Sequence, residues 1–262
     1  MPRILTNPDN LDELNQQFSH QRLQEPVFLN SVPKCGTHLI RNIMRMFVPV
    51  DQHYKNTFIQ YPVLNQHLAA FSTREPRISW GHLLFTDDSA IALKHARHLL
   101  IVRDPYDWVL ARARFFLSDN FQGQMENLKG GAVSIDEVLN LMIFGIIGKS
   151  PTVREIFQHN ALAWMGTKVR IIRMEDLVAA VKSVESDESE QFFEGLLTFL
   201  GIAKPADWVD RIRVGSDREQ SGTARENLSG IKEVIPTELP EMQKRLVDHM
   251  LPGVRELLGY ED

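Results

Sequence analysis

A lysine and a glycine stand together where a predicted strand meets a predicted helix. A mostly apolar run, residues 27–32, ends at Pro33-Lys34, turns through Gly36 and continues as a helix from about Thr37. A strand, a tight loop and a helix N-terminus in this order hold phosphate on backbone N–H groups and on the positive end of the helix dipole. The Walker A pattern of ATP-hydrolysing enzymes places its lysine after the glycine. Here Lys34 precedes Gly36 and no G-x-x-x-x-G-K-[ST] pattern occurs, so the loop indicates a nucleotide site of another kind.

Three more side chains with suitable chemistry lie at predicted strand ends or in loops. His82 follows a short strand candidate, Arg103 ends a buried strand, and Arg225 lies in an irregular, glycine- and serine-rich segment. Ligands of open α/β sheets bind beyond the carboxyl ends of the strands. We therefore expect these residues and Lys34 to form a cationic site that also contains a proton acceptor.

The elements that position these groups alternate between strands and helices. Strands are predicted at residues 27–32, 78–80, 98–102 and 168–173, and helices at 11–24, 37–48, 108–118 (with Asp107 as its N-cap), 134–147, 151–164, 188–200 and 238–258. Residues 51–76 and 214–237 are predicted to be mainly loop. This alternation indicates a parallel sheet covered on both faces. The predicted fold class is α/β, with a central parallel β-sheet flanked by helices in a P-loop-like architecture, and residues 1–262 are predicted to form a single domain.

The composition restricts the compartment and the classes of partner. A formal net charge of -5 gives no general basic field, so binding to nucleic acid or to anionic membrane surfaces is not expected. No apolar run approaches the roughly 18 residues of a membrane span. The single cysteine, Cys35, allows no intramolecular disulfide and fits a reducing compartment, so a cytoplasmic protein is expected. No metal is expected, because strand alternation separates His95 from His98 and no carboxylate–histidine helix motif accompanies them.

Two sequence signatures resemble those of sulfotransferases that use 3′-phosphoadenosine 5′-phosphosulfate as the donor. Residues 33–38, P-K-C-G-T-H, are similar to that family's P-K-S-G-T-T loop, and residues 99–107 resemble its hydrophobic strand followed by R-[DN]-P-x-D. His82 lies 21 residues before Arg103, close to the place of the catalytic histidine in cytosolic members. Further similarity to the family's Y-E-D-L, F-L-G and R-K-G-x-x-G segments is found at residues 173–177, 197–202 and 225–230.

The resemblance implies a role for each of these residues in sulfuryl transfer. Negative charge develops on the leaving phosphate, and an ammonium group beside helix N-terminal N–H groups stabilises it without a metal, which is the role expected of Lys34. His82 is the expected general base for the acceptor hydroxyl. Arg103 and Arg225 are expected to bind the 3′-phosphate with their forked donors. The other residues expected to bind the donor are Cys35, Gly36, Thr37, His38 and Gly230.

The chain departs from the family pattern at positions expected near the 3′-phosphate. Ala111 stands where the family has a serine, and Glu226-Asn227 stands where it has Lys-Gly. Arg112 and Arg114 are candidates to compensate for the lost serine.

Two other functions stay open on the sequence alone. One is a P-loop-like kinase that uses ATP and Mg²⁺, although a strand ending in Arg103 before Asp104 suits a metal carboxylate poorly. The other is a nucleotide-binding module without transfer activity, which the departures at Ala111 and Asn227 motivate. For a sulfotransferase the expected acceptor is the hydroxyl of a small molecule or a carbohydrate. The sequence does not specify that acceptor or the oligomeric state.

Overall fold

The computed structural model describes residues 3–5, 8–54, 58–123, 125–221, 224 and 227–260. The chain divides into two compact units, and each is described by itself. The sheet unit comprises Asp9–Val102 and His159–Gln220. The helical unit comprises Met1–Pro8, Arg103–Gln158 and Ser221–Asp262. A single domain over the whole chain stays a prediction.

The sheet unit contains a five-stranded sheet in the order β3-β4-β2-β5-β7. The strands are β2 (Val27–Ser31), β3 (Ile59–Gln60), β4 (Ile78–His82), β5 (Arg97–Val102) and β7 (Arg170–Arg173). Every neighbouring pair runs parallel, so the carboxyl ends of the strands share one edge. All residues of β2 and all but the first of β5 are buried, as is typical of strands covered on both faces.

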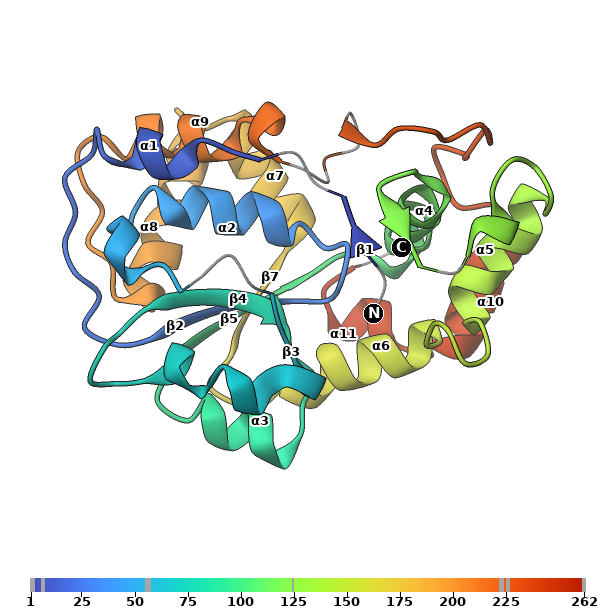
Figure 1. Ribbon diagram of the computed structural model, residues 1–262, viewed down its shortest axis with the longest axis horizontal. Coiled ribbons are helices and arrows are strands. Elements are labelled where there is room, and N and C mark those ends of the chain that lie inside the picture. The colour runs from blue at the N-terminus through green and yellow to red at the C-terminus, as the bar shows by residue number, and fades with distance from the viewer. Residues whose placement is uncertain are drawn as a thin grey trace. The chain divides into compact units, whose positions relative to one another are not determined.

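Helices lie on both faces of this sheet. Those of the sheet unit are α1 (Leu11–Asn15), α2 (Thr37–Arg45), α3 (Asp87–Ala92), α7 (Met174–Lys182), α8 (Asp187–Leu200) and α9 (Trp208–Ser216), with 3-10 helices at Val50–Gln52, Tyr61–Gln66, Leu68–Phe71, Leu162–Trp164 and Arg218–Gln220. Figure 1 shows α2 between the sheet and the helices α1 and α9, with α3 on the opposite side. The predicted α/β class with a parallel sheet flanked by helices is confirmed.

The predicted helix over residues 11–24 is wrong beyond Asn15. The Asn15 side chain donates from Nδ2 to the carbonyls of Arg45, at 2.5 Å, and Val48, at 3.0 Å. The last carbonyls of a helix have no partner within that helix. The side chain of the last residue of α1 therefore closes the C-terminal end of α2.

Two other elements of the sheet unit differ from the sequence-based expectation. β3 lies within residues 51–76, predicted as loop, and α9 runs into residues 214–237, also predicted as loop. β3 has only two residues, too few for a recognisable alternation. The inner side of α9 includes the buried Arg211, which interrupts the apolar periodicity that would mark a helix.

The helical unit contains five helices among its described residues. They are α4 (Pro105–Leu117), α5 (Ile135–Phe144), α6 (Val153–Asn160, whose last two residues belong to the sheet unit), α10 (Glu241–Met250) and α11 (Val254–Leu257), with a 3-10 helix at Glu126–Leu128. β1 (Arg3–Ile4) and β6 (Phe121–Gln122) form an antiparallel pair. The predicted helix 238–258 is thus two helices, interrupted around Pro252. No helix within the described part of the chain is long and apolar enough to cross a bilayer.

The N-cap of α4 differs from the predicted one. The carboxylate of Asp104 accepts a hydrogen bond from the backbone N–H of Tyr106 at 2.9 Å, and Pro105 is the first helical residue. Proline suits this place because its missing N–H would have no partner in the first turn. Asp107 lies inside the first turn, so its assignment as N-cap is wrong.

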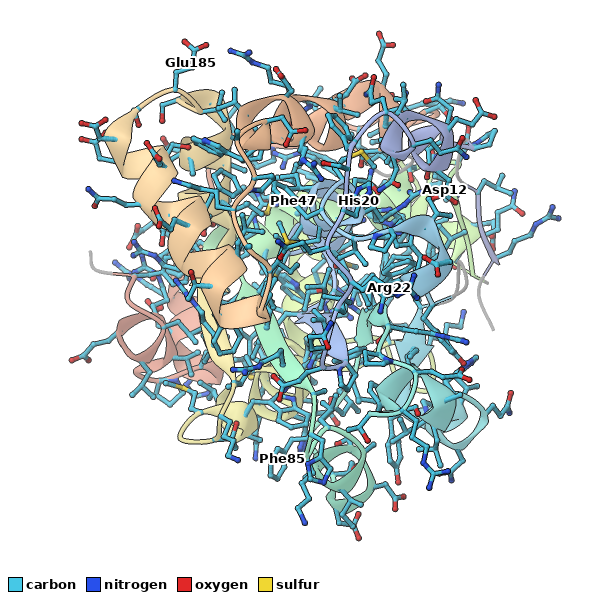
Figure 2. The ribbon with its side chains drawn as sticks, turned by 90° about the vertical axis from the view of Figure 1, so that its left-hand side faces the viewer. Asp12, His20, Arg22, Phe47, Phe85 and Glu185 are labelled. Carbon is cyan, nitrogen blue, oxygen red and sulfur yellow. The ribbon has the colours of Figure 1, made fainter. Side chains whose placement is uncertain are left out.

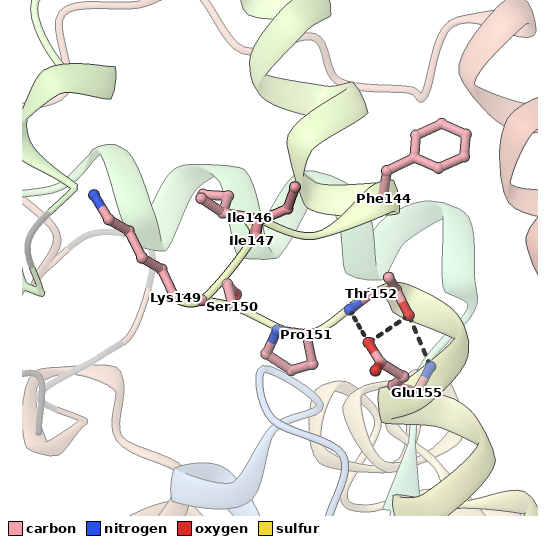
Figure 3. A pocket seen from close by; sticks show the side chains of 9 residues that line it. Phe144, Ile146, Ile147, Lys149, Ser150, Pro151, Thr152 and Glu155 are labelled. Carbon is pink, nitrogen blue, oxygen red and sulfur yellow. Dashed lines mark hydrogen bonds between the residues drawn. The ribbon is translucent and has the colours of Figure 1, made fainter.

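A hollow with a volume of about 380 Å³ lies where α5 connects to α6 (Figure 3). The predicted helix 134–147 ends at Phe144, and Ile147 is fully exposed in the turn that follows. At the other side, the Glu155 carboxylate accepts hydrogen bonds from the backbone N–H and the hydroxyl of Thr152, at 2.7 and 2.8 Å (Figure 3). These polar groups cap α6, so we assign the hollow to the local structure of this connection.

Candidate functional site

The loop between β2 and α2 has an unusual backbone at Lys34. Its φ is +71°, and it is the only non-glycine residue with a positive φ in the described part of the chain. An L-residue in this left-handed region costs about 1–2 kcal/mol, and such strain concentrates at functional sites. The following Gly36, with φ +84°, is the N-cap of α2, and a Cβ there would lie 3.2 Å from Met174 Cγ. The positive φ therefore favours glycine at position 36, and a Cβ there would also require the Met174 side chain to shift by a few tenths of an ångström.

The N-terminus of α2 offers backbone N–H groups to an anion. No described side chain caps it, and its first turn contains no acidic residue. The first N–H groups of a helix have no partner within the helix and carry the positive end of its dipole. The predicted donor-binding residues Gly36, Thr37 and His38 all lie at this end. Cys35 is fully buried, and its thiol donates to the Pro33 carbonyl at 3.9 Å.

His82 is the last residue of β4, beside the end of β2. The Asn30 side chain fixes this edge, because its amide donates to the Leu83 carbonyl at 3.0 Å and accepts from the Leu83 N–H at 2.8 Å. The imidazole Nδ1 lies 3.0 Å from the Ser31 carbonyl and 3.1 Å from the Ser31 hydroxyl. A carbonyl only accepts, so the hydrogen-bond pattern assigns the proton to Nδ1 and the lone pair to Nε2.

The electrostatic surroundings keep the His82 ring neutral. Burial, and to a smaller extent the charge of Lys34, lower its pKa from 6.5 to about 4, against the opposing effect of the bond to Ser31. A neutral imidazole with an unprotonated Nε2 can take a proton. His82 is therefore unprotonated at neutral pH and able to accept a proton, although its proton affinity is below that of an exposed histidine.

His38 faces the same region through an aromatic neighbour. The ring of Phe58 lies 5.1 Å from that of His38 and stacks at 5.6 Å on that of His82. Burial, followed by the charges of Arg41 and Lys34, lowers the His38 pKa to about 3. At neutral pH His38 is uncharged, so the positive charge near the loop comes from Lys34 and Arg41.

Sequence reasoning missed Arg41 and Ser31. The Arg41 guanidinium is buried over the Trp80 ring at 4.6 Å, and its Nη2 lies 3.9 Å from Asp9. Burial lowers its pKa to about 10, so it stays charged at neutral pH. The position of Arg41 in the sequence could have indicated this, because a residue four positions after Thr37 lies on the same face of the helix.

The residues predicted to bind the 3′-phosphate belong to the helical unit or lie outside the described residues. Arg103 directly follows β5; its Nη2 lies 3.8 Å from Asp107, and its buried Nε has no hydrogen-bond partner among the described residues. Gly230 has φ +76°, and a Cβ there would collide with the Asp119 carboxylate. Arg225 lies outside the described residues.

The two arginines considered as substitutes for the missing serine at Ala111 have structural partners. Arg112 is buried and donates to the carbonyls of Met142 and Pro151, both at 2.9 Å. Arg114 donates to the Pro236 carbonyl at 3.0 Å. Within the described side chains, no group of three His, Cys, Asp or Glu residues is placed to hold a metal ion.

Comparisons with known proteins show the fold. No family model matches the chain, and neither does any curated protein sequence. A solved structure does match: the crystal structure of mouse sulfotransferase SULT7A1 complexed with PAP, with a TM-score of 0.55 over 95% of this chain and 91% of that chain. The chain has the sulfotransferase fold. The sequence identity is 16%, so the likeness concerns the fold, and it confirms at that level the resemblance found in the sequence.

Proposed function

We propose that the protein is a sulfotransferase that moves a sulfuryl group from 3′-phosphoadenosine 5′-phosphosulfate to an acceptor hydroxyl. One observation carries this proposal: within the sheet unit, the Lys34 loop at the N-terminus of α2 and the basic Nε2 of His82 lie at the ends of adjacent parallel strands. The sulfotransferase fold supports it independently.

Each residue of the sheet-unit site has a defined task in this reaction. Lys34 and the first N–H groups of α2 bind the 5′-phosphate and stabilise the charge that develops when its bond to sulfur breaks. His82 takes the acceptor proton on Nε2 as the acceptor oxygen forms its bond to sulfur. The products are the sulfated acceptor and adenosine 3′,5′-bisphosphate. Metal is not required, because Lys34 supplies the neutralising charge.

The 3′-phosphate is assigned to Arg103, Arg225 and the Gly230 loop. The 3.8 Å separation from Asp107 is long for an ion pair, so the Arg103 guanidinium is able to turn to a dianion at small cost. Arginine suits a phosphate because its planar fork donates two parallel hydrogen bonds.

The two alternatives make different demands on the same residues. A Mg²⁺-dependent kinase would use a carboxylate such as Asp104 to hold the metal. That carboxylate already caps α4 and accepts from the Arg255 guanidinium, at 3.2 and 3.1 Å, which disfavours a metal role. A binding module without activity would keep the nucleotide site and transfer nothing.

Ligand-dependent thermal unfolding, followed by a transfer assay, tests the proposal. A ligand that binds only the folded state raises the unfolding temperature. We expect adenosine 3′,5′-bisphosphate to raise it more than AMP, and ATP to do no better with Mg²⁺ than without. Labelled donor is then offered to a panel of hydroxylated small molecules and carbohydrates. Strict Mg²⁺ dependence would favour the kinase, and bisphosphate binding without transfer to any acceptor would favour the silent module. The cytoplasmic location stays a prediction, which cell fractionation checks.

A further inference from the structure

Two hydroxyl groups connect His82 to the start of α2. The Ser31 hydroxyl lies 3.1 Å from His82 Nδ1 and also makes a short hydrogen bond to the Thr37 hydroxyl. Ser31 is fully buried and Thr37 nearly so, which excludes most competition from water. We call the Ser31 and Thr37 hydroxyls the hydroxyl bridge. It joins the ends of β2 and β4 to the first residue of α2.

The protons along this chain of hydrogen bonds have two directions in which the Ser31 proton lies within the chain. In the first, His82 Nδ1–H donates toward Ser31 and the Ser31 hydroxyl donates to the Thr37 hydroxyl. The Thr37 hydroxyl then donates its own proton to an acceptor outside the bridge. In the second, Thr37 donates to Ser31, Ser31 donates to an unprotonated Nδ1, and the proton of His82 lies on Nε2. Each hydroxyl has one proton, so reversing one bond reverses its neighbour.

The two directions have opposite consequences for proton transfer. In the first, Nε2 has a lone pair and is able to accept the proton of an acceptor hydroxyl. In the second, Nε2 carries a proton and is unable to act as a base. The Ser31 carbonyl already favours the first, because it accepts from Nδ1 at 3.0 Å, and the Asn160 amide donates to the same carbonyl at 3.1 Å.

We propose that the hydroxyl bridge couples the phosphate bound at the Lys34 loop to the tautomer of His82. A bound phosphate oxygen accepts the Thr37 proton, so Ser31 donates to Thr37, and His82 keeps its proton on Nδ1. Ser31 is then a positioning residue: it touches neither substrate, but it holds His82 as a base once the donor is bound. This inference rests on the proposed function, since it needs a phosphate at the N-terminus of α2.

The tautomer can be observed directly in the full-length protein. Protonated and unprotonated imidazole nitrogens differ in ¹⁵N chemical shift, so protein labelled with ¹⁵N-histidine is titrated with adenosine 3′,5′-bisphosphate, and His82→Gln assigns the signal. With the bisphosphate bound we expect the proton on Nδ1 and none on Nε2. In Ser31→Ala the backbone carbonyl of residue 31 still accepts from Nδ1 and the hydroxyl that could donate to Nδ1 is gone, so we expect the proton on Nδ1 with and without the bisphosphate.

Kinetics then separate positioning from a merely structural effect. Thr37→Val should lower kcat by about 10- to 100-fold, part of the usual contribution of general-base catalysis, because the Ser31 hydroxyl is then left to donate to His82 Nδ1. Removing the Ser31 hydroxyl as well, in Thr37→Val/Ser31→Ala, should restore most of kcat, which a merely structural effect of Thr37→Val would not allow. The matched control is Ser79→Ala, which removes a hydroxyl that is equally buried in the neighbouring strand and bonded to the Val27 carbonyl at 3.3 Å. It should leave kcat and the His82 signals unchanged.

Thr37→Val keeps the side-chain shape and has two further readouts. It should populate the Nε2–H form of His82 and also weaken the bisphosphate. A bisphosphate that binds while Nε2 carries the proton overturns the coupling alone, as does a double variant no more active than Thr37→Val. A bisphosphate that does not bind at all overturns the proposed function, and the coupling with it.

Discussion

Arg211 and Met46 are 165 residues apart in sequence, and the Arg211 guanidinium donates to the Met46 carbonyl at 2.9 Å, at the C-terminal end of α2. The same guanidinium lies 5.7 Å from the ring of Phe47, and the His20 ring lies 3.2 Å from the same carbonyl; Figure 2 labels both of these residues. A cation at a helix C-terminus complements the helix dipole. The helix whose N-terminus forms the candidate site is therefore anchored at its other end by distant residues of the sheet unit.

Arg211→Met should destabilise the fold by about 2–4 kcal/mol, because it leaves buried carbonyls and the Asp207 carboxylate without their donor. The matched control is Arg213→Met on the same helix. Arg213 is half exposed and pairs with exposed acidic residues, so its loss should cost less than about 1 kcal/mol. Urea unfolding of both variants measures the difference. Equal losses would show that the anchor contributes nothing particular.

Lys34→Ala and Lys34→Gly should lose activity equally and differ in stability. Both remove the ammonium group, and removing one donor to a developing anion typically lowers kcat by about 100- to 1000-fold. Glycine adopts a positive φ without the steric cost that alanine has, so Lys34→Gly should be more stable than Lys34→Ala by about 1 kcal/mol. Turnover and thermal unfolding of the pair check this. A more stable alanine variant would contradict the strained backbone at Lys34, and full activity in either would remove Lys34 from the mechanism.

The parts of the site that the sequence predicted are those defined by local pattern. A strand, a loop with Gly36 and an apolar helix are adjacent in sequence, so the β2–α2 connection and the place of Lys34 were predictable. The strand ends of His82 and Arg103 were predictable for the same reason. The single-domain prediction and the joint site of these three residues stay predictions.

The missed features depend on contacts between distant segments. Asn15 ends α1 because it bonds to carbonyls 30 or more residues away, and no local pattern records that. Arg41 looks like a surface residue of an amphipathic helix and Arg211 like a residue outside any helix, yet both are buried by cation–π or carbonyl contacts. Ser31 is an ordinary strand residue by its sequence pattern, and the role proposed for it rests on its distance to His82.

Acid should destabilise the protein below pH 6.5 through three buried histidines. Burial is the main reason that the pKa of His38 and of His98 falls to about 3 and that of His82 to about 4. Between these values and 6.5 the unfolded chain binds protons that the folded chain does not. Stability therefore rises with pH across this window and is lost as the pH falls through it.

His98→Leu tests this dependence without touching the candidate site. His98 lies between the rings of Phe28 and Trp164, at 5.8 and 4.6 Å, and its buried Nε2 has no hydrogen-bond partner among the described residues. Its replacement should reduce the slope of unfolding free energy against pH by up to about 1.4 kcal/mol per pH unit, the equivalent of one proton. Urea titrations at several pH values measure the slope. The same slope in both proteins would mean that His98 titrates normally in the folded state.

Substitution of Arg103 should change ligand binding, whereas substitution of Arg112 should change the stability of the fold. Both lie within the same stretch of the helical unit. Among the described residues Arg103 makes one long ion pair, whereas Arg112 is buried over Trp108 at 4.8 Å and donates to two carbonyls. Arg103→Ala should weaken adenosine 3′,5′-bisphosphate by about 10- to 100-fold, the value of one charge-assisted contact, and leave stability and AMP binding nearly unchanged. Arg112→Met should instead lower stability by about 2–4 kcal/mol, because the carbonyls of Met142 and Pro151 lose a buried donor.

Calorimetric titration with the bisphosphate and with AMP, alongside urea unfolding, distinguishes the two arginines. The comparison between nucleotides isolates the 3′-phosphate, since the two ligands otherwise share their 5′-phosphate, sugar and base. If Arg103→Ala weakened both nucleotides equally, the arginine would act on a shared part of the ligand. If Arg112→Met kept its stability but no longer bound the bisphosphate, Arg112 and not Arg103 would be the residue that binds the 3′-phosphate. Arg112 would then compensate for the serine that Ala111 replaces.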